Sequence, residues 1–96
     1  MDVVIDGSAV QAERDVHRAL ARQLEFGDSY GWNLAALRDR LSTDVPRPVH
    51  LVWTDAEISR ARLGDENFER IVRVFTDVAA QDEGFGWEDR FTFELA

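Results

Sequence analysis

The sequence of 96 residues has no cysteine and no lysine, and only two prolines. The absence of cysteine excludes disulfide bonds, thiol nucleophiles and cysteine-ligated metal sites. No apolar run approaches the roughly 18 residues that a membrane helix needs. Residues 1–6 do not have the pattern of a secretory signal peptide. These absences predict a cytoplasmic protein with no membrane segment and no membrane partner.

What the chain does contain is typical of one folded domain, residues 1–96, with 45% apolar and 31% charged residues. The chain has eleven arginines and 19 acidic residues, so the net charge is −8. Most of the acidic excess lies in the second half of the chain. This charge disfavours nucleic acids as ligands and favours a basic protein partner, although acidity also simply increases solubility.

Apolar periodicity predicts three strands separated by four helices. The strands are expected at residues 3–5, 49–53 and 90–95, and the helices at residues 12–25, between Asn33 and Pro46, at residues 55–60 and at residues 66–81. Strands that alternate with helices indicate an α/β fold with a three-stranded parallel sheet and right-handed crossovers.

Two local patterns in the middle of the chain lead to specific predictions. Residues 49–53 hardly alternate between apolar and polar, which predicts a strand covered on both faces. Thr54 and Glu57 have the spacing of a capping box, in which Thr54 is the N-cap of the third helix.

The sequence offers little catalytic chemistry. His17 and His50 are most simply structural or surface residues, and none of the four serines lies in a hydrolase motif. Metal-binding motifs are absent, and residues 84–86 form a plain turn rather than a phosphate cradle. We therefore predict a protein that is not an enzyme and that binds no metal and no cofactor.

Two aspartates stand out on the predicted helices. At about 100° per residue, Asp39 lies almost opposite the buried leucines of the second helix, flanked by the small side chains of Ala35 and Ala36. Asp77 has a similar outward position on the last helix. Exposed aspartates on helices are common, but two on neighbouring helices could enter a basic, phosphate-binding pocket of another protein.

Residues 29–41, SYGWNLAALRDRL, carry a fairly specific pattern, Y-G-x-N-L followed by an aspartate. This pattern resembles the barstar family, the intracellular inhibitors of barnase-type ribonucleases. The resemblance extends to residues 5–7, 15–20 and 74–77, and to Pro48, Leu51 and Trp53. It implies a barstar-like fold for nearly the whole chain. The family often has a cis peptide bond at the proline that matches Pro48.

The resemblance implies inhibition of a basic, secreted, guanyl-specific microbial ribonuclease. In the family, the second helix and the loop before it plug the active site. The aspartate that matches Asp39 takes the place of a substrate phosphate, bonded to catalytic arginines and a histidine. We expect a protein that is monomeric when free. The predicted partner-binding residues are Ser29, Gly31, Trp32, Asn33, Ala35, Arg38, Asp39, Val45 and Asp77.

Several of these positions depart from the family pattern. Ser29 replaces an aromatic residue, Ala35 an acidic residue, and Arg38 a tryptophan, while Asp77 replaces a glutamate. Trp32 is an added aromatic residue in the loop. The surface is therefore less negative than is usual in the family, which favours a cognate ribonuclease other than barnase.

Other functions remain open at this point. The chain could be an adaptor that binds another basic protein and inhibits no ribonuclease. Self-association through the alanine face is a second possibility. An acid/base hydrolase built on Asp39, Asp77 and a histidine is the least favoured, because both acids are predicted to point outward.

Overall fold

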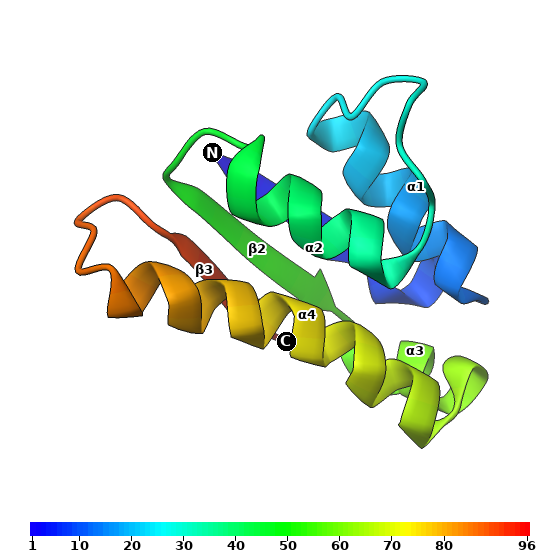
Figure 1. Cartoon of the computed structure of the whole chain (residues 1–96). Coiled ribbons are helices and arrows are strands. Elements are labelled where there is room, and N and C mark those ends of the chain that lie inside the picture. Colours follow the sequence, from blue (N-terminus) through cyan, green and yellow to red (C-terminus); the bar gives the residue numbers. More distant parts are fainter.

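Three parallel strands form one sheet in the computed structural model, which describes residues 1–96 (Figure 1). The order is β1–β2–β3, so β2 pairs with a strand on each side. The strands are β1 (Asp2–Asp6), β2 (Val49–Thr54) and β3 (Phe91–Leu95). In the register, Val3 and Phe93 both lie beside Leu51. The predicted parallel sheet is confirmed.

The helices connect the strands. They are the short 3-10 helix η1 (Gly7–Ala9), α1 (Glu13–Gln23), α2 (Leu34–Thr43), α3 (Ala56–Leu63) and α4 (Asp65–Gly84). The four predicted helices are confirmed, although α3 and α4 each extend three residues beyond their predicted ends. None of the helices combines the length and the apolar character that crossing a membrane would require.

The core lies on one side of the sheet, where α1, α2 and α4 cover it (Figure 1). Trp53 of β2 and Phe75 of α4 are fully buried at its centre. The prediction that β2 is covered on both faces is wrong: Val49, Leu51 and Trp53 are buried, whereas the alternate residues are only half-buried. Because the helices pack on the same side, the second face of the sheet stays open.

The start of α3 also differs from the prediction. Thr54 is the last residue of β2, and its hydroxyl donates to the Ile5 carbonyl oxygen of β1 at 3.3 Å. Asp55, with a φ of 48°, takes the N-cap position without a side-chain capping bond. Pairing with β1 directs the Thr54 hydroxyl away from α3, so the predicted capping box does not form.

A buried ion pair joins three segments at one end of the sheet. The Arg47 guanidinium, next to the cis Arg47–Pro48 peptide bond, donates to both Asp82 carboxylate oxygens of α4, at 2.7 and 3.1 Å. The Phe91 N–H of β3 also donates to Asp82, at 2.7 Å. Burial by itself raises the pKa of Asp82, but these hydrogen bonds and the charges of Arg47 and Arg90 bring it below its ordinary value.

We expect Asp82→Asn to lower the free energy of unfolding at pH 7 by about 3 kcal/mol, because it leaves a largely buried Arg47 without its counter-ion. Urea denaturation measures this change. Asp77→Asn is the matched control, because Asp77 also pairs with an arginine but is 48% exposed. Its expected cost is below about 1 kcal/mol. Equal losses in the two variants would contradict the assignment.

The effect of Asp82 should also depend on pH. A lowered folded-state pKa stabilises the protein fully above the pKa in the unfolded chain, about 3.9. The stabilisation is lost as the pH falls through the folded-state pKa. The unfolding free energies of the wild type and Asp82→Asn should therefore converge below pH 4. A constant difference down to pH 3 would contradict this expectation.

Candidate functional site

The exposed face of α2 is the centre of the candidate site. Asn33 caps this helix, because its side-chain oxygen accepts from the Ala36 N–H at 2.8 Å. Leu37 and Leu41 are fully buried, whereas Ala35 and Asp39 are exposed. The predicted outward position of Asp39 is therefore confirmed, and it follows from the burial of the two leucines on the opposite side of the helix.

The Asp39 carboxylate has no hydrogen bond and no ion pair with any other residue of the chain. The Asp39 main-chain carbonyl oxygen, in contrast, accepts a hydrogen bond from the Thr43 hydroxyl at 2.8 Å. A charged group that is solvated and unpaired in the free protein is available to a cationic partner. Ala35 leaves the approach to it open.

Asp77 is paired with an arginine, whereas the sequence predicted an outward-pointing carboxylate. Its carboxylate accepts from the Arg38 guanidinium across the contact between α2 and α4, at 2.9 Å. Asp77 is half-buried rather than fully outward. Two positions that depart from the family pattern thus neutralise each other, and the face of α2 carries one free carboxylate instead of two.

Arg40 of α2 anchors the preceding loop to the helix through hydrogen bonds and ring contacts. The Arg40 guanidinium donates to the Phe26 carbonyl oxygen at 2.6 Å and to the Ser29 hydroxyl at 3.0 Å. It also lies over the rings of Phe26 and Tyr30, at 5.5 and 5.8 Å from their centroids. Sequence reasoning missed this role, although an arginine beside the buried stripe of α2 and two aromatic residues in the loop were visible signals.

Hydrogen bonds to the buried His17 side chain of α1 support the loop on its inner side. The imidazole of His17, in α1, bonds to the Tyr30 hydroxyl at 2.5 Å through Nδ1 and to the Glu13 carboxylate at 2.8 Å through Nε2. Burial and the nearby charge of Glu13 raise the pKa of Tyr30 well above its ordinary value, so its hydroxyl stays neutral and can donate. His17 is a structural residue here, as its sequence context indicated.

The tip of the loop carries the predicted contact residues. Trp32 has a left-handed φ of 53°, and its indole is 47% exposed, with its ring 5.9 Å from that of Tyr30. At Gly31 a Cβ atom would lie 3.2 Å from the Ala36 Cβ, tighter than an ordinary contact. The Asn33 amide donates to the Gly31 carbonyl oxygen at 3.1 Å. Loop and helix therefore form one continuous surface.

Val45 lies apart from this group, at the opposite end of α2. Its side chain is 8% exposed and belongs to the core, so a partner could touch only its edge. Its carbonyl oxygen accepts from the Arg47 guanidinium at 2.8 Å. The other predicted residues are gathered on the loop, on the outer face of α2 and on the adjoining turn of α4.

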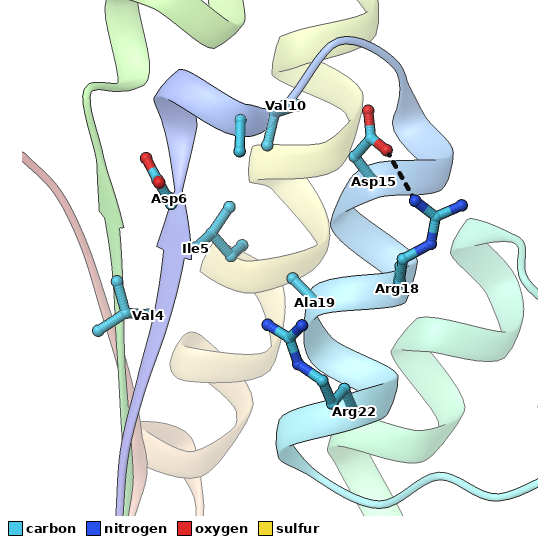
Figure 2. A pocket seen from close by; sticks show the side chains of 9 residues that line it. Val4, Ile5, Asp6, Val10, Asp15, Arg18, Ala19 and Arg22 are labelled. Carbon is cyan, nitrogen blue, oxygen red and sulfur yellow. Dashed lines mark ion pairs between the residues drawn. The ribbon is translucent and has the colours of Figure 1, made fainter.

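The hollows in the protein surface lie elsewhere. Figure 2 shows the groove between β1 and α1, with the Asp15–Arg18 ion pair on α1 and the Arg22 side chain extending toward β1. The Gln23 side-chain amide makes two hydrogen bonds to the main chain of Val4. It donates to the carbonyl oxygen at 2.8 Å and accepts from the N–H at 3.1 Å. A second hollow lies between the start of α1 and the end of α3. No residue of the loop or of α2 lines either one.

The chemistry of the candidate site is that of an exposed anion on a rigid support. No group of three histidine or acidic side chains is placed to hold a metal ion. A carboxylate resembles a phosphate group in charge and in its oxygen acceptors, and an arginine can bind it through two parallel hydrogen bonds. The surface therefore suits a partner whose own cleft is cationic.

The chain is similar in sequence to known proteins. The family described as "Barstar (barnase inhibitor)" matches residues 1–95. The chain is also similar to YrdF of Bacillus subtilis (strain 168), a protein named provisionally as a ribonuclease inhibitor. The two are 39% identical over 62 residues, which cover 65% of this chain and 68% of YrdF.

We expect Arg40→Ala to loosen the loop without unfolding the protein, because it removes two hydrogen bonds from a charged donor, each worth about 1.5–3 kcal/mol. Hydrogen exchange of the amides in residues 26–33 should become at least about tenfold faster. The buried amides of α4 should change much less. Arg22→Ala is the control, since the Arg22 side chain makes no hydrogen bond and no ion pair. Unchanged exchange in the loop would refute this role of Arg40.

Proposed function

The chain belongs to the barstar family, whose members are inhibitors and not enzymes, and we propose that it inhibits a barnase-type ribonuclease by occluding the active site. The loop at residues 27–33 and the outer face of α2 enter the cleft of the enzyme. Asp39 takes the position of a substrate phosphate. The observation that carries this proposal is the unpaired Asp39 carboxylate on an exposed helical face beside a fastened loop.

The physical basis is that the Asp39 carboxylate exchanges its hydration water for the cationic groups of the enzyme. The active site of a ribonuclease must bind phosphate, so its cationic groups accept a carboxylate in the same place. Asp39 needs no internal bond to be broken before it binds. Around it, Trp32 supplies an exposed aromatic ring and Ala35 leaves space for the wall of the cleft. A standard interface would bury about 800 Å² on this side.

The partner we propose is a basic, secreted ribonuclease other than barnase. Arg38 neutralises Asp77, so the contact face is less negative and attracts a strongly basic rim less. Ser29 has no ring to stack on a partner, whereas Trp32 supplies one in the same loop. We propose further that residues 1–96 act as a single domain that is monomeric when free.

Asp39→Ala should weaken binding by at least about 2 kcal/mol, or roughly thirtyfold, because charged anchors at the centre of an interface carry much of the affinity. A fluorogenic RNA-cleavage assay against a panel of barnase-type guanyl-specific ribonucleases measures the inhibition constant. Glu66→Ala is the matched control, since it removes the same charge from an exposed position in the first turn of α4. An unchanged constant for Asp39→Ala would exclude Asp39 from the site.

The same assay separates inhibition from binding alone. Stoichiometric loss of RNA cleavage in the presence of the wild type supports occlusion. A complex that forms by titration calorimetry while cleavage continues would instead indicate an adaptor for a basic protein. The absence of both complex and inhibition across the panel would refute the proposed function.

Arg38→Gln should accelerate association with the inhibited ribonuclease about two- to fivefold at low salt, because it frees the Asp77 carboxylate and removes a positive charge from the contact face. Stopped-flow mixing measures the rate constant. Arg14→Gln changes the net charge equally but lies in α1. The advantage of Arg38→Gln should disappear near 1 M salt, where the Debye length is about 3 Å. Equal acceleration by both variants would show that only net charge matters.

A further inference from the structure

Helices α2 and α4 lie side by side in parallel, and their contacts repeat at a constant offset. Arg38 bonds to Asp77, and Ser42 donates to the Gln81 side chain at 3.2 Å, so both contacts join residues that are 39 positions apart. One turn further, Phe85 continues the α4 stripe of Asp77 and Gln81. The C-terminal ends of both helices lie on the same side of the molecule, at the left in Figure 1. Phe85 therefore extends the α2–α4 surface beyond the end of α2.

Phe85 and Trp87 form a close, tilted aromatic pair that the rest of the chain leaves largely exposed. Their ring centroids are 4.8 Å apart with an interplanar angle of 33°. Phe85 is 62% exposed and Trp87 is 43% exposed. Other aromatic residues of the chain are buried or half-buried, except Trp32 at the opposite end of α2. An exposed apolar pair next to a proposed interface is typical of a binding anchor.

The pair is also held in position rather than loosely attached. The Arg90 Nε–H donates to the Trp87 carbonyl oxygen at 2.7 Å. The Gly86 N–H donates to the Glu83 carbonyl oxygen at 3.0 Å, and Gly86 has the left-handed φ of 73° that glycine permits. A ring pair that is already ordered loses little conformational entropy when a partner covers it.

Acidic residues flank the two rings in the sequence. Glu83, Glu88 and Asp89 are exposed and make no ion pair within the chain. Aromatic faces bordered by carboxylates favour an arginine side chain, whose planar guanidinium stacks on a ring while its N–H groups bond to the acids. The chemistry of this patch thus matches a basic protein surface.

We propose that the Phe85–Trp87 pair is a second anchor for the ribonuclease, taking an arginine of the enzyme surface beside its active site. This inference rests on the proposed function, because it adds a contact to the same complex. Trp32 and the Phe85–Trp87 pair then lie beyond opposite ends of α2, a helix about 15 Å long. Asp39 lies between these two aromatic contacts, and the ribonuclease covers the whole length of the helix.

The test measures dissociation constants for Phe85→Ala and Trp87→Ala against the ribonuclease that the wild type inhibits most strongly. Each variant should bind about tenfold more weakly or worse, mainly through faster dissociation. Ile58→Ala is the control, because Ile58 is an exposed apolar residue, 41% exposed, on the distant α3. Thermal unfolding should be nearly unchanged for all three, since the altered side chains are exposed.

Asp39→Ala is measured in parallel so that the two proposals can fail separately. Weaker binding by Asp39→Ala with wild-type affinity for both aromatic variants would overturn the second anchor and leave the proposed function standing. Equal loss for Ile58→Ala and the aromatic variants would also overturn it. If the wild type bound no ribonuclease of the panel, both proposals would fall.

Discussion

The buried Asp82 carboxylate determines how the C-terminal half of the molecule is assembled. It accepts from Arg47 in the α2–β2 connection and from the first N–H of β3, while its own main chain belongs to α4. A largely buried charge is tolerated only when such donors surround it. Consequently the end of α2, the edge of the sheet and the turn that carries Phe85 are held in one arrangement.

The candidate binding surface depends on a second arginine, Arg40, which plays a similar part at the other end of α2. It joins the loop to the helix through hydrogen bonds and aromatic contacts, and the buried His17–Tyr30 pair supports the loop from below. A loop that is ordered before binding gives up less entropy in the complex. The two arginines thus stabilise the two ends of the surface, and Asp39 lies exposed between them.

Charge acts at two distances in this protein. The net charge of −8 attracts a basic protein over several ångströms of solvent. At contact range, however, the ion pair between Arg38 and Asp77 leaves a single free carboxylate on the face of α2. In the proposed complex, Asp39 and the exposed aromatic rings make the central contacts.

Apolar periodicity was enough to predict the elements and the direction of Asp39, because it reports which side of a helix or strand is buried. The sequence also indicated the family through residues 29–41. Three features could not be predicted in this way: one face of the sheet stays open, Thr54 bonds to β1 instead of capping α3, and Asp77 is paired. Each of these depends on a partner 39 or more residues away, or on which side the helices pack, and local periodicity contains no information about either.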